Sequence, residues 1–321
     1  MSERSEIILA DGVRLHAELS GPADAPVTVV LMHSWCLDRR IWQHQVAALG
    51  GMGRKAPRVI AYDTRGHGRS GATRLRSATL GQLGDDLAEV INQLAPSGPV
   101  ILAGHSMGGM TIMEYAHRHP DDFAARVAGL LFVSTTAEGH THTRYGLPPH
   151  LATVLRAGET IGAGLLARSG AWCPHRAVLP ALRPAVRWLL FGDDCSGEAL
   201  RLTLRSLGRA PLRSIGGFRA SVGAQQRLDT LAALGDVPAA VLAGDRDRLT
   251  PPACARSIAD ALPGAELEVF PGAGHMLPLE RPEEVSAALT GIVRRVVRQA
   301  KRERHEEALR MSGTAGVRQA A

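Results

Sequence analysis

The sequence contains little lysine, few aromatic residues and no paired cysteine motif. Lys55 and Lys301 are its two lysines, whereas arginine is frequent, and aromatic residues make up 4% of the chain. The four cysteines have neither C-x-x-C nor metal-ligand spacing; they are Cys36, Cys173, Cys195 and Cys254. This pattern argues against a disulfide framework and predicts reduced thiols in a cytoplasmic protein.

Long apolar runs are also missing. No stretch approaches the roughly 20 apolar residues that a bilayer-spanning helix needs, and residues 1–6 are polar, unlike a signal peptide. We therefore expect no integral membrane span and a cytoplasmic location. The formal net charge is +6 and the pI is about 9.7. Because no aromatic–basic interleaving and no nucleic-acid motif accompanies the basic residues, we expect no nucleic-acid partner.

Short apolar runs alternate with helical patterns along most of the chain. This alternation predicts an α/β fold with a mostly parallel central sheet and helices on both faces. Residues 7–17 predict an opening hairpin with its turn at Asp11-Gly12. Later strands are predicted at Val27–Met32, Val59–Tyr62, Val100–Ala103, Leu130–Val133, Ala239–Ala243 and Leu267–Phe270. Helices are predicted at Leu80–Leu94, with Asp85, Asp86 and Glu89 on its polar side, and at Met107–His117.

One long segment interrupts the alternation. Residues 138–225 carry several prolines among amphipathic helical stretches, which predicts an inserted helical cap over the carboxyl edge of the sheet. The core is then discontinuous, formed by residues 1–137 and 226–297. The tail, residues 298–321, is polar and then rich in serine, glycine and alanine, so we expect it to be disordered.

The most informative motif is Gly104-His105-Ser106-Met107-Gly108, which follows the apolar run at residues 100–103 and precedes a helical pattern. This is the G-x-S-x-G pattern in its strand–turn–helix context. A serine on such a tight turn holds its hydroxyl clear of the backbone, where a substrate and a base can both reach it. Ser106 is therefore a candidate nucleophile.

A serine hydroxyl is a weak nucleophile alone, so a base and an orienting carboxylate should follow. Asp245 and Asp247 come just after the strand predicted at residues 239–243, and His275 lies in a glycine-rich loop after the next strand. Carboxyl ends of parallel strands meet at one edge of a sheet, so these groups are expected near Ser106. Residue patterns alone leave either aspartate as the partner of His275.

Several short sequence motifs, in their order along the chain, resemble those of the α/β-hydrolase family, and the resemblance covers roughly residues 7–297. They are His33-Ser34-Trp35, Asp63 to Ser70, Gly104 to Gly108, Gly244 to Asp247, and Gly274-His275. The resemblance implies Ser106 as nucleophile, His275 as general base and then acid, and Asp247 as the orienting carboxylate, since the family places its acid three residues after the glycine. It also implies chemistry that requires no metal and no organic cofactor.

The same resemblance implies an oxyanion hole from two backbone N–H groups, those of Met107 and Trp35. Here the chain carries Ser34 where the family usually has glycine, which puts the aim of the Trp35 donor in question. His105 is expected to pack beside the serine turn, and His67 with Arg65 to fasten the loop after Tyr62. His140, His142 and His150 match no common metal-site spacing.

The function predicted from these residues is a serine hydrolase acting on a carboxylic ester or related small-molecule acyl substrate through an acyl-enzyme. A cofactor-free perhydrolase or haloperoxidase, or an acyltransferase, would use the same triad and is the first alternative. A ligand-binding relative without turnover is the second. Chain length of the substrate and oligomeric state are not predicted.

Overall fold

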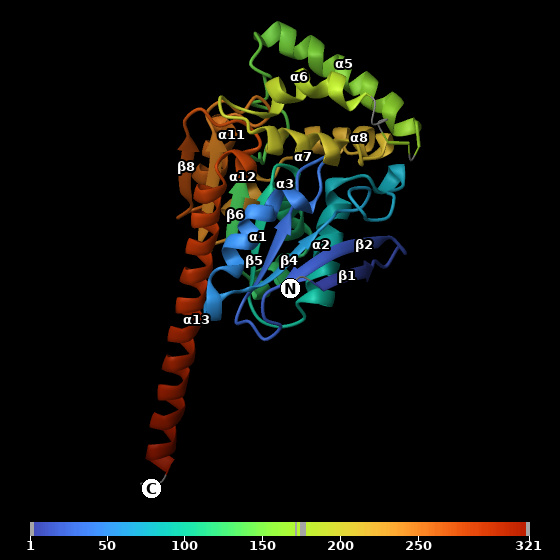
Figure 1. Cartoon of the computed structure of the whole chain (residues 1–321). Coiled ribbons are helices and arrows are strands. Elements are labelled where there is room, and N and C mark those ends of the chain that lie inside the picture. The colour runs from blue at the N-terminus through green and yellow to red at the C-terminus, as the bar shows by residue number, and fades with distance from the viewer. Residues whose placement is uncertain (1–2, 171, 174–177, 319–321) are drawn as a thin grey trace.

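The computed structural model describes residues 3–170, 172–173 and 178–318, with side chains described as far as residue 302. Its described strands form a single sheet of eight, in the order β1-β2-β4-β3-β5-β6-β7-β8 (Figure 1). Their bounds are β1 Glu3–Ile8, β2 Arg14–Ser20, β3 Thr28–Met32, β4 Arg58–Tyr62, β5 Val100–His105, β6 Val127–Val133, β7 Ala239–Gly244 and β8 Glu266–Phe270.

The first two strands form the hairpin that the sequence predicts, since β1 pairs antiparallel with β2. β2 also runs antiparallel to β4, and every later pair from β4 to β8 is parallel. The six later strands predicted from apolar runs all exist, each with one end as predicted and the other shifted by one to three residues. The predicted fold class, a mostly parallel sheet with helices on both faces, is confirmed.

Helices fill the connections. They are α1 Gln43–Gly50, α2 Leu80–Leu94, α3 Met107–Arg118, α4 Pro120–Arg126, α5 Pro149–Arg168, α6 Leu179–Leu190, α7 Gly197–Leu207, α8 Leu212–Gly217, α9 Arg219–Ala224, α10 Leu228–Ala232, α11 Pro252–Ala261, α12 Leu277–Glu280 and α13 Pro282–Arg318. Short 3-10 helices are η1 Arg39–Trp42, η2 Gly53–Lys55 and η3 Leu75–Ser77. None of the described helices combines the length and apolar character that crossing a bilayer requires.

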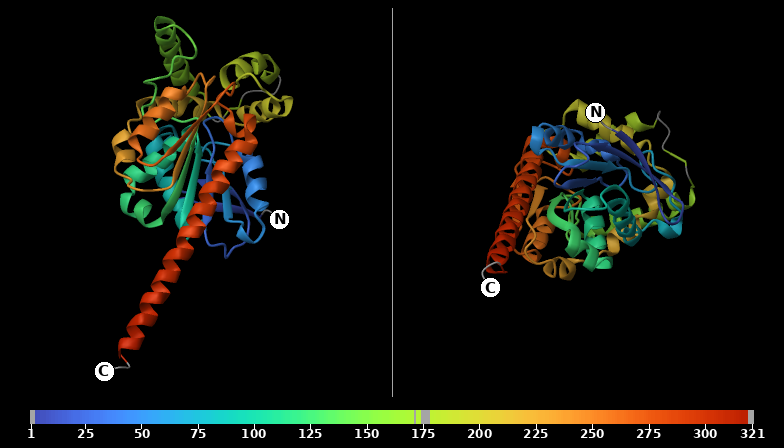
Figure 2. Two further views of the ribbon diagram at one scale, coloured as in Figure 1. Left: turned by 90° about the vertical axis from the view of Figure 1, so that its left-hand side faces the viewer. Right: turned by 90° about the horizontal axis from the view of Figure 1, so that it is seen from below.

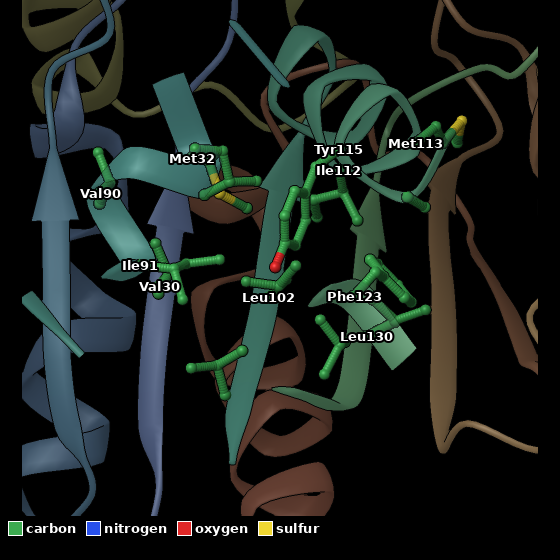
Figure 3. Packing of buried hydrophobic residues seen from close by; sticks show 14 of the residues in the cluster. Val30, Met32, Val90, Ile91, Leu102, Ile112, Met113, Tyr115, Phe123 and Leu130 are labelled. Atoms are coloured by element: carbon green, nitrogen blue, oxygen red, sulfur yellow. The ribbon is translucent and has the colours of Figure 1, made fainter. Parts of the chain in front are cut away.

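The sheet has an apolar core on each face because successive strand residues point to opposite sides. Val30 and Met32 of β3 pack with α2, α3 and α4 on one face, the region drawn in Figure 3. Val29 and Leu31 lie in the cluster on the other face, with residues of α13. Strands buried on both faces read as continuous apolar runs, which is why β3 and β5 were recognisable in the sequence.

Helices α5 to α9 all fall between β6 and β7, within the segment 138–225 that was predicted to be a helical insertion. Figure 1 shows α5, α6, α7 and α8 together at one end of the sheet, with α5 outermost. The left view of Figure 2 shows the same helices at this end, away from the N-terminus. Parallel strands β5, β6 and β7 end on that side, where α/β folds build their ligand sites.

Two details differ from the sequence predictions. Asp86 was placed on the polar side of its helix, but it is buried and accepts two hydrogen bonds from Arg65, at 2.5 and 2.6 Å. The tail 298–321 was expected to be disordered, but α13 continues to Arg318 and extends away from the body (Figures 1 and 2); residues 319–321 lie outside the described ones. Arginine, glutamate and alanine dominate residues 298–310, and all three favour helix.

Candidate active site

Ser106 sits at the turn between β5 and α3, in the strained backbone conformation that the motif predicts. Its φ is 54° and its ψ is −116°, a region that non-glycine residues rarely adopt. Its N–H donates to the carbonyl of Val133 at 2.9 Å, which ties the turn to β6. A Cβ added at Gly104 would lie 2.4 Å from the Gly108 backbone, and one at Gly108 would lie 2.3 Å from Met32 O. Both glycines are therefore needed for the turn to close.

His275 lies in the loop between β8 and α12, and its side chain is nearly fully buried. Its Nδ1–H donates to Oδ2 of Asp247 at 2.8 Å. The loop is fixed by Glu280, whose carboxylate accepts the N–H groups of Gly192, Gly274 and Met276 at 2.7 to 3.0 Å. Burial raises the pKa of Glu280. This carboxylate holds the His275 loop against the end of α6, a role that the sequence analysis missed.

Asp247 is buried, and its two oxygens are fully engaged. Oδ1 accepts the N–H groups of Leu249 and Thr250, each at 2.8 Å. Oδ2 accepts the Thr250 hydroxyl at 2.8 Å as well as His275. Asp245, by contrast, is exposed and its carboxylate accepts the N–H of Gly272 at 2.8 Å. Of the two aspartates that the sequence left open, Asp247 is the one that contacts the imidazole.

Two further residues support this arrangement. The Thr250 hydroxyl also lies 3.3 Å from His275 Nδ1, so it flanks the Asp247–His275 hydrogen bond. His105 Nε2 donates to the backbone carbonyl of His275 at 2.8 Å, and the two rings lie 5.0 Å apart. Burial lowers the pKa of His105 well below its usual range, so the ring is neutral at pH 7. His105 thus joins the serine turn to the His275 loop, as its predicted place beside the turn implied.

The two predicted oxyanion donors lie close to this site. Trp35 and Ser106 line the same cavity, and Met107 is the first residue of α3. Neither the Met107 N–H nor the Trp35 N–H donates to any group in the described part of the chain. The loop before Trp35 is held by His33, whose Nδ1–H donates to Ser34 O at 2.7 Å while Nε2 accepts the Thr64 N–H at 3.0 Å. Cys36 has a positive φ of 62°.

A cavity of about 470 Å³ opens over these groups. Ser106 and His275 line it together with apolar side chains from α5, α6, α7, α8 and α9: Leu166, Val186, Leu189, Leu207, Ile215 and Val222. One wall is polar: Arg219 donates to Glu159 at 2.9 Å and to His140, and Tyr145 donates to Glu159 at 2.7 Å. A mostly apolar pocket of this size with few polar groups is typical of a small-molecule site.

The other histidines singled out in the sequence do not meet at a metal site. His142 pairs with Glu138 at 3.0 Å, and His140 accepts from Arg219. Across the described residues, no group of three or more histidine, cysteine or acidic side chains could hold a metal ion. Arg65 fastens its loop as predicted, by pairing with Asp11 at 2.7 Å as well as with Asp86.

Comparisons with known proteins agree with this architecture. The chain is 28% identical over 291 residues to the monoacylglycerol lipase of Mycolicibacterium smegmatis, covering 88% of this chain and 94% of that one. It is 26% identical over 299 residues to 3-oxoadipate enol-lactonase 1 of Acinetobacter baylyi, covering 92% and 100%. Among solved structures, a thermophilic esterase from Thermogutta terrifontis superposes with a TM-score of 0.71 at 27% identity, covering 92% of this chain and 99% of that one.

The model of the alpha/beta hydrolase family matches residues 29–288, which include every residue of the site described above. The sheet has eight strands, a serine lies at the strained turn after β5, and the relatives are named as a lipase, an enol-lactonase and an esterase. The chain is therefore an enzyme that belongs to the alpha/beta hydrolase family.

Proposed function

We propose that this protein hydrolyses a carboxylic ester or related acyl compound through an acyl-enzyme, with Ser106, His275 and Asp247 as its catalytic triad. The observation that carries the proposal is the buried 2.8 Å hydrogen bond between Asp247 and His275 beside the strained Ser106. His275 and Ser106 line one cavity, and because Nδ1 of the imidazole faces Asp247, Nε2 is the nitrogen left to receive the serine proton.

The proposed reaction begins when Ser106 Oγ attacks the acyl carbon and His275 Nε2 takes the hydroxyl proton. Asp247 fixes the tautomer with hydrogen on Nδ1 and stabilises the imidazolium that forms. The imidazolium then gives its proton to the leaving oxygen. In the second half, His275 takes a proton from water, the resulting hydroxide attacks the acyl carbon, and the acid leaves as the proton returns to Ser106.

Negative charge develops on the carbonyl oxygen in both halves. The N–H groups of Met107 and Trp35 are the proposed donors, since Met107 begins α3 and neither N–H has a hydrogen-bond partner among the residues that the structure describes. One such donor is worth ~10²–10³ in rate. The helical segment 138–225 is proposed as a cap that holds the acyl chain, because its apolar side chains line the cavity above Ser106. We also propose the cytoplasm as its compartment, because the sequence has four cysteines and no C-x-x-C or metal-ligand spacing among them.

The proposal is tested by labelling and kinetics together. A fluorophosphonate probe should modify Ser106, identified by peptide mass spectrometry, and hydrolysis of p-nitrophenyl esters should fall by at least ~10⁴-fold in Ser106→Ala. The variant should unfold in urea at the same midpoint as the parent, because the change removes one oxygen and keeps the backbone. Retained turnover in Ser106→Ala would remove this serine from the mechanism. Product analysis with added peroxide or alcohol distinguishes hydrolysis from acyl transfer.

A further inference from the structure

The positive charge of this protein is concentrated in one segment. Residues 138–225 contain eleven arginines, no lysine and five acidic residues, so they account for the entire formal net charge of +6. Acidic and basic residues balance in the remainder of the chain, although the arginines look evenly spread along the sequence. Arginines of the segment that are exposed in the structure are Arg144, Arg168, Arg183, Arg201, Arg205 and Arg209.

The outermost helix of the same segment exposes an apolar face. In α5, Val154 and Ile161 are each 70% exposed and Leu165 is 64% exposed. Leu151 and Leu155 complete the set, which we call the α5 stripe. Along the helix, Val154 and Leu155 follow Leu151 by three and four positions. Ile161 follows Val154 by seven positions, and Leu165 follows Ile161 by four. Such spacing puts them on one face.

The α5 stripe is held outward by the packing of the rest of the helix. Residues Ala163 and Leu166 of α5 line the cavity above Ser106. The backbone of α5 packs tightly on α8, since a Cβ added at Gly216 would lie 2.2 Å from the carbonyl oxygen of Ala163. Figure 1 shows α5 as the helix farthest from the sheet at this end. The stripe therefore forms the outer surface of the roof over the catalytic cavity.

From these observations we propose that the α5 stripe, with Arg168 of the same helix and the other exposed arginines of the segment, forms a docking surface for an anionic lipid layer. A contiguous row of large exposed apolar side chains marks an interaction site. A helix with one apolar face and flanking arginines is suited to the boundary between lipid headgroups and acyl chains. The exposed tryptophans Trp172 and Trp188, at 78% and 46%, lie in the same segment, and tryptophan is enriched at that boundary.

Charge favours this occupant over a second copy of the chain. Two copies joined through α5 would bring together two segments that each carry a formal charge of +6. An anionic lipid surface instead attracts arginines within about one Debye length. Docking would also bring the roof of the cavity to a layer that contains acyl chains, so a substrate could enter from the lipid.

Vesicle flotation tests the proposal on the full chain. Binding is expected to vesicles of phosphatidylglycerol and phosphatidylcholine in equal parts, to weaken as salt is raised, and to be weak with phosphatidylcholine alone. The double variant Ile161→Ser/Leu165→Ser should lower the partition coefficient at least ~10-fold, because it removes two of the most exposed apolar groups. Ile8→Ser, at an apolar residue that is 61% exposed on β1, is the matched control and should bind like the parent.

Charge variants test the electrostatic part separately. Arg168→Gln and Arg183→Gln should each weaken binding about fivefold, whereas Arg294→Gln, at an exposed position on α13, should not. Ser106→Ala should bind vesicles like the parent, so loss of catalysis and loss of docking are distinguishable. Hydrolysis of a water-soluble ester and the circular dichroism spectrum should be unchanged in Ile161→Ser/Leu165→Ser.

Three results would overturn the proposal. The first is equal binding of the parent and Ile161→Ser/Leu165→Ser to the anionic vesicles. The second is equal binding of the parent to anionic and neutral vesicles, or no binding to either. The third is a dimer in sedimentation velocity that the same double variant dissociates, which would assign the stripe to a second copy of the chain.

Discussion

Replacement of Asp247 by asparagine is the sharpest test of the site, because the structure fixes how the new side chain must lie. Oδ1 of Asp247 accepts two backbone N–H groups, from Leu249 and Thr250. In Asp247→Asn the amide oxygen must keep that place, since an NH₂ there would face two donors. The NH₂ then stands where Oδ2 was, 2.8 Å from His275 Nδ1.

An NH₂ at that place donates to His275 Nδ1 and so forces the imidazole proton onto Nε2. The nitrogen that should take the serine proton is then already protonated, and the imidazolium loses its carboxylate. In serine proteases the same change lowers kcat by about 10⁴, which corresponds to about 5.4 kcal/mol of transition-state stabilisation. We expect a loss of similar size in Asp247→Asn, measured as kcat on a p-nitrophenyl ester.

Asp245→Asn is the matched control, two positions away on the same turn. Asp245 is exposed, and its carboxylate accepts the Gly272 N–H, which the amide oxygen of asparagine can also accept. We expect kcat within about threefold of the parent, a change of less than ~1 kcal/mol. If Asp245→Asn lost more activity than Asp247→Asn, or if Asp247→Asn kept kcat within tenfold, the assignment of the carboxylate would be wrong.

Two further predictions concern stability. Gly104→Ala should lower the free energy of unfolding by ~1–3 kcal/mol, because its Cβ would lie 2.4 Å from a backbone atom of Gly108. Gly158→Ala, in α5 with nothing within 4 Å of the added Cβ, should instead raise it by ~0.5–1 kcal/mol. Urea denaturation followed by circular dichroism measures both, and equal effects would refute the packing argument. Burial lowers the pKa of His67 to about 3 and lowers that of His105 well below its usual range. The unfolded chain therefore binds more protons, and stability should fall as pH drops below about 6.5, with each of these histidines contributing up to ~1.4 kcal/mol per pH unit. His67→Gln should reduce the change in unfolding free energy per pH unit, and an unchanged pH dependence would contradict a lowered pKa of His67 in the folded protein.

The sequence predicted those features that depend on neighbouring residues. Each strand buried on both faces appears as an apolar run, and the order of runs and helical patterns predicted the sheet. Ser106 was found because the glycines around it and the strand before it are local signals. Helix α2 was predicted with its observed ends, Leu80 and Leu94, since its apolar residues recur with helical period.

Sequence reasoning was weaker where a side chain's partner is distant. Residue pattern could not distinguish Asp245 from Asp247 as the partner of His275. Both aspartates follow β7 within three residues, and only the backbone of the turn decides which carboxylate faces the imidazole. Thr250 and Glu280 were missed, since a hydroxyl beside a carboxylate and a carboxylate that collects three N–H groups have no sequence signature. Asp86 looked like a solvent-facing helix residue, and its partner Arg65 lies 21 positions away.

The chain by itself therefore determined the strands, the serine turn and the set of candidate catalytic groups, because propensity and periodicity act over a few residues. The tertiary structure decided which of those groups touch, what lines the cavity, and that the apolar face of α5 is left exposed. A helix with apolar residues at Val154 and Ile161 is ordinarily read as packed against a core. In the folded protein, α8 packs against the other side of α5 at Gly216, and the face with Val154 and Ile161 is therefore exposed.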